Sequence, residues 1–84
     1  MRILIAEDDN STRVTLTDDL KAAGHDVTAV HDGSGAESAL EGGSFDCAIL
    51  DIRMPGADGV DLMKEIRSRS PETEVILMTG HGTM

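Results

Sequence analysis

The chain has little cysteine and no long apolar run, and each of these absences excludes a class of protein. Its one cysteine, Cys47, lies inside an apolar segment, so we expect a small buried side chain in a reducing compartment, without chemistry of its own. No segment approaches the roughly 18 apolar residues of a membrane-spanning helix, and Glu7-Asp8-Asp9 interrupts the first apolar segment before a signal peptide could form. We therefore expect a cytoplasmic protein that does not enter a membrane.

Basic residues are also scarce. Seven lysines and arginines stand against sixteen aspartates and glutamates, which gives a formal net charge of -9. A chain this acidic repels the phosphates of nucleic acids and anionic lipid head groups. We expect it to bind neither, and its charged partners should be cations or basic surfaces. With 84 residues there is room for one domain and no second functional module.

Short apolar segments alternate with amphipathic ones along the chain. The predicted strands are 2–6, 26–30, 45–50 and 74–78. Each segment between them has helix capping or terminating residues at its ends, namely Asp9 or Asn10 with Gly24, Asp32 with Gly42-Gly43, and Asp58 with Pro71. Strands that alternate with helices through short loops form a parallel sheet with helices on both faces. The pattern therefore predicts a doubly wound α/β fold.

Each predicted helix carries apolar residues on the side expected to face the sheet. They are Val14, Leu16, Leu20 and Ala23 in the first, Ala36, Ala39 and Leu40 in the second, and Val60, Leu62, Met63 and Ile66 in the third. Because the residues of the second set are small, we expect the second helix to be weakly packed.

Two of the predicted strands run directly into carboxylates. Ile3-Leu4-Ile5-Ala6 precedes Glu7-Asp8-Asp9, and Cys47-Ala48-Ile49-Leu50 precedes Asp51. In neighbouring parallel strands these acidic ends would meet at the carboxyl edge of the sheet, where open α/β folds bind ligands. At an effective dielectric near 20, each pair of carboxylates about 4–5 Å apart costs roughly 3–4 kcal/mol, so the cluster suits a hard divalent cation such as Mg²⁺. The sequence predicts metal-assisted phosphate chemistry at Asp51.

These residues also have plain structural interpretations. An acidic triplet after a strand can cap the next helix, and Asp9 fits a cap better than a ligand. Asp51 could form a turn before a loop. Thr79 could be an ordinary residue at a strand end, and His81 an exposed loop residue. The functional interpretation gains its weight from the order of several motifs along one chain.

Taken in order, four motifs resemble those of the receiver domains of two-component response regulators. They are Glu7-Asp8 after the first strand, Asp51 at the end of the third, Met54-Pro55-Gly56 followed by Gly59, and Thr79-Gly80 after the fourth. The resemblance covers residues 1–84 and implies one receiver domain. It also implies a flavodoxin-like strand order of 2-1-3-4.

The resemblance implies a role for each acidic residue. The residue matching Asp51 accepts a phosphoryl group from the phosphohistidine of a sensor histidine kinase or a phosphotransfer protein. Glu7 and Asp8 match the pair that holds Mg²⁺ or Mn²⁺, directly or through water, and Arg53 would add its backbone carbonyl. Glu7 is longer than the aspartate that is commoner there, a difference that the waters kept by Mg²⁺ can absorb.

The resemblance also assigns residues around the phosphoryl group. Thr79 matches the hydroxyl that hydrogen-bonds this group and moves on activation, and Gly80 leaves its backbone N–H open to it. Arg53 and His81 match the positions that tune dephosphorylation. The implied function is a signalling switch that is no enzyme beyond its own phosphorylation and dephosphorylation. Thr79-Gly80-His81-Gly82 resembles the receivers of transcription activators, which makes transcription the suggested output.

The sequence stops where receivers usually continue with a helix, a fifth strand and a last helix. The lysine that follows the fifth strand in the family has no counterpart among the seven basic residues. We therefore expect a receiver that is incomplete at its C-terminus, either as a whole molecule or as part of a longer protein. The segment Val75-Ile76-Leu77-Met78 would then be an exposed apolar edge strand, which predicts self-association through it.

Two other functional classes stay open. A receiver fragment that binds proteins without being phosphorylated would fit the missing lysine. A phosphatase or phosphotransferase of the haloacid dehalogenase type also uses an aspartyl nucleophile at a strand end, but it carries a second acid two residues later. Arg53 occupies that position and cannot replace the acid, which disfavours this class.

Overall fold

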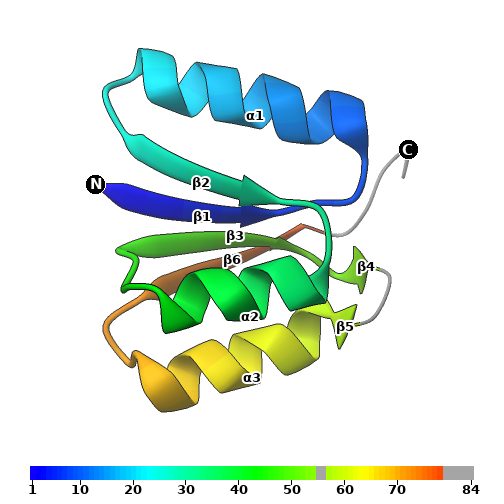
Figure 1. The fold of residues 1–84 in the computed structure, drawn as a ribbon, viewed down its shortest axis with the longest axis vertical. Helices are drawn as coiled ribbons and strands as arrows, with labels where there is room; N and C mark the ends of the chain where they lie inside the picture. Colours follow the sequence, from blue (N-terminus) through cyan, green and yellow to red (C-terminus); the bar gives the residue numbers. More distant parts are fainter. Residues whose placement is uncertain (55–56, 79–84) are drawn as a thin grey trace.

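The computed structural model describes residues 1–54 and 57–78, with the backbone alone at residues 54, 57 and 58. Its main sheet consists of the parallel strands β1 (Arg2–Ala6), β2 (Asp26–Val30), β3 (Cys47–Asp51) and β6 (Glu74–Met78). They lie in the order β2-β1-β3-β6 (Figure 1). The predicted strand order 2-1-3-4 is therefore confirmed.

Helices lie on both faces of this sheet, as predicted. Helix α1 (Asn10–Ala22) lies on one face, and helices α2 (Gly33–Glu41) and α3 (Gly59–Arg69) lie together on the other (Figure 1). Within the described ranges, none of the helices has the length and apolar character needed to cross a membrane.

Alternate residues of the strands build two separate cores. On the face of α2 and α3, strand residues such as Leu4 and Leu50 pack with Leu62 and Ile66. On the face of α1, the core contains Ile3, Ile5 and Cys47. Both faces of β1 are covered, so its residues 3–6 are all buried. This is why the strand is continuously apolar rather than alternating.

Helix α1 is the least buried helix, which corrects two predictions. Val14 and Ala23 were predicted to face the sheet, but Val14 is 49% exposed, Ala23 is exposed too, and α1 has no fully buried residue. Only Leu16 and Leu20 of this helix pack against the core of their face. Helix α2, predicted to be weakly packed, buries Ala36 completely. Its other inward residues, Ala39 and Leu40, are partly buried.

The predicted caps are confirmed where the structure describes them. The Asp9 carboxylate accepts hydrogen bonds from the Thr12 N–H at 2.9 Å and from its hydroxyl at 2.7 Å. Asp32 accepts from the Gly35 N–H at 2.8 Å. Gly24 ends α1 with a φ of 95°, a conformation that glycine adopts without a Cβ penalty. Local polar side chains therefore fix where both helices start.

A short hairpin between β3 and α3 was not predicted. Strands β4 (Arg53–Met54) and β5 (Ala57–Asp58) pair antiparallel, while Pro55 and Gly56 lie outside the described residues. The hairpin leads α3 back to the end of β3, where the Gly59 N–H donates to the Ile52 carbonyl at 2.9 Å. A Cβ on Gly59 would lie 2.3 Å from the Asp51 carbonyl oxygen. This close approach requires glycine.

Candidate metal and phosphoryl site

The site lies at the carboxyl edge of the sheet, where β1 and β3 end side by side. Ala6 of β1 pairs in register with Leu50 of β3, so the residues that follow, Glu7 and Asp51, lie at the same level. The Glu7 N–H donates to the Val30 carbonyl of β2 at 3.1 Å, which continues the sheet through this residue. Asp51 is still within β3 and pairs with Met78 of β6. This pairing explains why β3 extends one residue beyond the predicted end.

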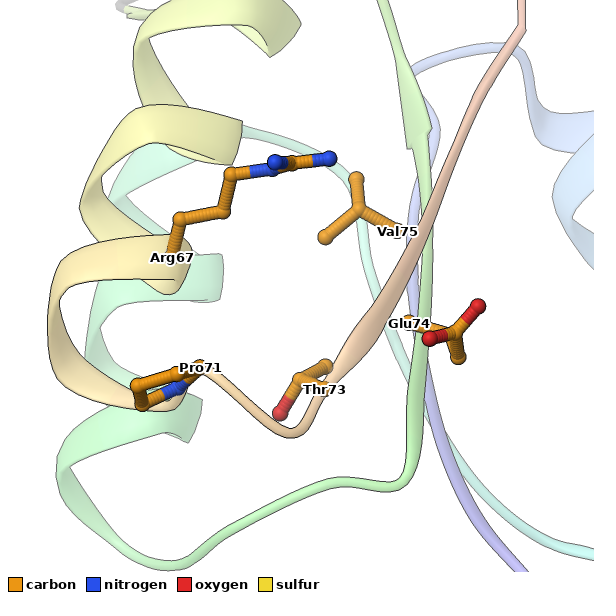
Figure 2. A pocket seen from close by; sticks show the side chains of 5 residues that line it. All are labelled: Arg67, Pro71, Thr73, Glu74 and Val75. Carbon is orange, nitrogen blue, oxygen red and sulfur yellow. The ribbon is translucent and has the colours of Figure 1, made fainter.

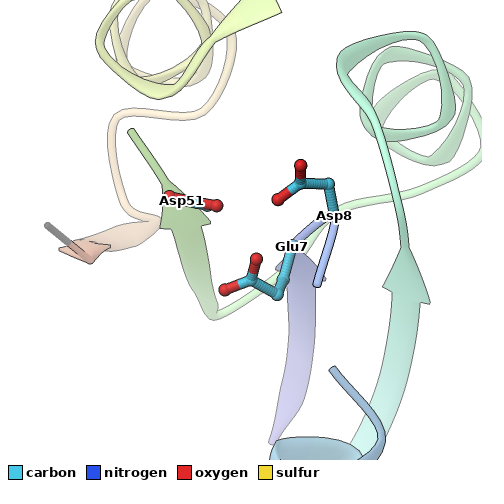
Figure 3. A group of neighbouring side chains, drawn as sticks. All are labelled: Glu7, Asp8 and Asp51. Carbon is cyan, nitrogen blue, oxygen red and sulfur yellow. The ribbon is translucent and has the colours of Figure 1, made fainter. Parts of the chain in front are cut away.

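Three carboxylates converge there, as the sequence predicted. Glu7, Asp8 and Asp51 each offer an oxygen, and these oxygens all lie within 4.8 Å of one another (Figure 3). Glu7 is 1% exposed and Asp51 is 0% exposed, whereas Asp8 is exposed. A cation would therefore approach from the side of Asp8.

Backbone N–H groups orient the two buried carboxylates. Glu7 Oε2 accepts from the Asp9 N–H at 2.9 Å, and Asp51 Oδ1 accepts from the Arg53 N–H at 3.2 Å. Each acidic side chain is thus fixed by the turn that follows it.

The donor set fits a hard divalent cation. At an effective dielectric near 20, two carboxylate charges at this separation repel by roughly 3 kcal/mol. A divalent cation between them converts the repulsion into attraction, and Mg²⁺ and Mn²⁺ favour carboxylate oxygens. Glu7, Asp8 and Asp51 are the residues that would hold it. Arg53 begins β4 with an exposed side chain.

Other residues singled out by the sequence have separate positions. Asp9 caps α1 and is absent from the carboxylate cluster. Thr79, Gly80 and His81 lie outside the described residues. Cys47 is buried in the core between the sheet and α1. This burial raises the pKa of its thiol, and the negative charges of Glu74 and Asp46 raise it further. The thiol is therefore protonated at neutral pH.

Sequence reasoning missed one residue beside the site, Arg13. Its guanidinium donates to the Glu7 carbonyl at 3.0 Å through Nη1 and to Asn10 Oδ1 at 2.6 Å through Nη2. The signal available in the sequence was a basic residue in the first turn of a helix that follows an acidic strand end.

A hollow of about 340 Å³ lies apart from the site, between the end of α3 and the start of β6 (Figure 2). Its lining residues are Arg67, Pro71, Thr73, Glu74 and Val75. The Thr73 hydroxyl donates to the Phe45 carbonyl at 2.7 Å. This hydrogen bond joins the segment before β6 to the segment before β3. The hollow is at the amino end of β6, whereas Asp51 pairs with the carboxyl end, so the two are separate.

Comparison with known proteins assigns the family. The family model described as "Response regulator receiver domain" matches residues 3–84. The chain belongs to this family. Receiver domains are signalling domains of two-component systems and not classical enzymes, which confirms the resemblance found from the motifs.

Receiver relatives include transcriptional regulators. The chain is 39% identical over 80 residues to the transcriptional regulatory protein FixJ of Bradyrhizobium diazoefficiens, covering 95% of this chain and 39% of FixJ. It is 38% identical over 82 residues to the DNA-binding transcriptional regulator NtrC of Escherichia coli, covering 98% of this chain and 18% of NtrC. The chain thus spans less than half the length of either relative.

Solved receiver structures have the same fold. The response regulator TrrA of Thermotoga maritima, crystallised in complex with Mg(2+)-BeF, matches with a TM-score of 0.87 and 32% identity, over 96% of this chain and 70% of TrrA. TrrA in complex with the histidine kinase ThkA matches with a TM-score of 0.84 and 32% identity, over 99% of this chain and 73% of TrrA.

Proposed function

We propose that this receiver accepts a phosphoryl group on Asp51, from the phosphohistidine of a sensor histidine kinase or phosphotransfer protein, in a reaction that requires Mg²⁺ or Mn²⁺. The observation that supports this proposal is the convergence of Glu7, Asp8 and Asp51 oxygens within 4.8 Å at the carboxyl edge of the sheet. TrrA, a relative with the same fold, was crystallised with Mg(2+)-BeF.

Different residues at the site would have different roles in phosphoryl transfer. An Asp51 oxygen would attack phosphorus, and the bond from phosphorus to the histidine nitrogen would break. The Arg53 N–H, which donates to Asp51 Oδ1, orients the carboxylate, and the Asp51 side chain points toward Glu7 and Asp8 (Figure 3). The cation, when bound, screens the negative charge of the phosphoryl group from the three carboxylates. The Arg53 carbonyl would be a further ligand.

The roles of the last residues follow from the family motif. We assign Thr79 as the hydroxyl that hydrogen-bonds the phosphoryl group and switches on activation, and Gly80 as a backbone N–H donor to it. Arg53 and His81 would tune dephosphorylation. The structure of TrrA with ThkA supports a kinase partner, and FixJ and NtrC support a transcriptional output in a longer protein of the cytoplasm.

Intact mass spectrometry tests the proposal. The chain is incubated with Mg²⁺ and a small acyl phosphate, beside an Asp51→Asn variant and a sample containing a chelator. We expect one phosphoryl adduct on the wild type with Mg²⁺ and none on the other two samples. A folded wild type that forms no adduct would instead favour a receiver that binds proteins without being phosphorylated.

We also propose that this chain associates with itself through β6. Within the described residues β6 pairs with β3 on one side alone, and Ile76 on this strand is 52% exposed. An apolar edge strand offers backbone N–H and C=O groups to a second chain. Light scattering over a concentration series should show dimers in the wild type and fewer in Ile76→Lys. The control is Val14→Lys, which changes a similarly exposed residue on α1. A monomeric wild type at high concentration would contradict the proposal.

A further inference from the structure

Arg13 occupies an unfavourable place in helix α1. It is the fourth residue of the helix, within the first turn, where the positive end of the helix dipole repels a cation and favours an acid. The helix has no acidic residue in that turn. The helix dipole therefore does not explain an arginine at this position, but the hydrogen bonds of its guanidinium do.

The two hydrogen bonds of Arg13 join the end of β1 to the start of α1. Nη1 donates to the Glu7 carbonyl and Nη2 donates to the Asn10 side chain. The guanidinium is planar and carries its donors in a fixed fork, so two bonds to different acceptors set the distance between them. Asp8, an exposed member of the carboxylate cluster, lies in the short segment that this fork closes.

Glu7 is held at three of its polar groups. Its N–H donates to Val30, its Oε2 accepts from the Asp9 N–H, and its carbonyl accepts from Arg13. The first two contacts fix one side of the residue within the sheet and the turn. The contact with Arg13 ties it to a side chain of α1.

We propose that Arg13 is a positioning residue of the cation site. By holding the Glu7 carbonyl and the first residue of α1, it keeps the Glu7 and Asp8 carboxylates converged on Asp51. This inference rests on the proposed function, since it requires that the three carboxylates bind a divalent cation. Partners that orient metal ligands from the second layer typically contribute 10–100-fold to metal affinity.

Geometry and charge predict opposite results, which makes the inference testable. If the fork positions the ligands, Arg13→Ala and Arg13→Lys should both weaken cation binding, because lysine keeps the charge but loses the planar fork. If Arg13 acts only as a nearby positive charge, Arg13→Ala should tighten binding and Arg13→Lys should leave it unchanged.

The experiment is titration calorimetry of Mg²⁺ and Mn²⁺ into the wild type, Arg13→Ala, Arg13→Lys and Arg69→Ala. Arg69 is the charge control, since it pairs with Glu65 at 3.1 Å at the far end of α3. We expect the dissociation constants of both Arg13 variants to rise about tenfold or more, and that of Arg69→Ala to stay within about twofold of the wild type. Circular dichroism confirms that each chain is folded at the titration temperature.

Two further readouts separate positioning from general destabilisation. Asn10→Ala removes one acceptor of the fork at an exposed residue and should weaken binding less than the Arg13 variants do. The Mg²⁺ concentration that half-saturates adduct formation should rise in Arg13→Lys, whereas the rate at saturating Mg²⁺ should approach that of the wild type.

The outcomes also separate this inference from the proposed function. A wild type that binds Mg²⁺, beside an Arg13→Lys variant with the same affinity, would overturn the positioning role and leave the receiver function intact. Tighter binding by Arg13→Ala would overturn it as well. A folded wild type that binds neither cation would overturn both.

Discussion

Asp51 combines a chemical role with an energetic cost. It is fully buried, and its carboxylate lies in a cluster with two others whose oxygens are within 4.8 Å. Without a cation these like charges repel, so the residue proposed to carry the chemistry weakens the fold that contains it. Functional residues of this kind are conspicuous because they oppose local stability.

The first prediction removes that charge. Asp51→Asn in the presence of a chelator should raise the free energy of unfolding by on the order of 1 kcal/mol, because one charge leaves the cluster while the side-chain shape is kept. Urea unfolding measures it, with the exposed Asp18→Asn on α1 as a control of equal charge. A large loss of stability in Asp51→Asn would show that the carboxylate is needed by the fold.

The second prediction concerns the contact behind the acceptor. Gly59→Ala should lower the free energy of unfolding by roughly 1–3 kcal/mol, because the added Cβ would lie 2.3 Å from the Asp51 carbonyl oxygen. Gly42→Ala is the matched control, since its Cβ would meet the nearest atom at 3.6 Å. Equal stability of the two variants in urea would contradict the required close approach.

At the scale of elements, the junction of β1 and α1 carries both the cap and the ligands. The Asp9 side chain accepts a hydrogen bond from the Thr12 N–H, and the Asp9 N–H donates one to the Glu7 carboxylate. The cap side chain and the contact to the ligand are thus separate atoms of one residue. A substitution of the side chain can test the cap without removing the backbone contact.

The third prediction uses this separation. Asp9→Ala should cost about 1 kcal/mol of folding free energy, whereas Asp9→Asn should cost much less because asparagine is also a good N-cap. Mg²⁺ affinity should change little in Asp9→Asn, since Asp9 is outside the carboxylate cluster. Urea unfolding and Mg²⁺ titration measure the two effects. A strong loss of Mg²⁺ binding in Asp9→Asn would make Asp9 a ligand rather than a cap.

At the scale of the molecule, the net charge of -9 means that cations can raise the stability of the fold in two ways. Any cation that binds the folded chain and not the unfolded one stabilises it by mass action, by about 2.7 kcal/mol at a concentration one hundred times the dissociation constant. General screening by salt also lowers the repulsion among exposed acids. The two effects need to be separated by a variant at the site.

The fourth prediction separates them. Mg²⁺ should raise the melting temperature of the wild type well beyond a sodium chloride solution of equal ionic strength, and this excess should shrink in Asp8→Ala. Asp8 is exposed, so its removal should disturb the fold little in the absence of metal. Thermal melts monitored by circular dichroism measure both chains. The same Mg²⁺ response in Asp8→Ala would place the cation elsewhere.

Local patterns predicted most of the fold. Strand and helix segments, the caps at Asp9 and Asp32 and the terminating Gly24 depend on neighbours within a few residues, and the structure has them where expected, except that β3 begins and ends later than predicted. Val14 was misassigned because helical spacing gives the direction of a side chain but not how much of that direction is covered. The β4–β5 hairpin was missed because each of its strands has two residues, too few to show a period.

The sequence by itself determined which carboxylates meet at the edge of the sheet. It supplied acidic residues directly after apolar strands, and in parallel strands both ends must reach the same edge of the sheet. Only the tertiary structure decided the geometry. The register of Ala6 with Leu50 places Glu7 beside Asp51. The start of α3 lies against the end of β3, which brings Gly59 close to the Asp51 carbonyl. The hydrogen bond from Arg13 to the Glu7 carbonyl also depends on the tertiary structure. These contacts depend on how far the chain travels between elements, and that distance is fixed by packing of the whole sheet rather than by any local pattern.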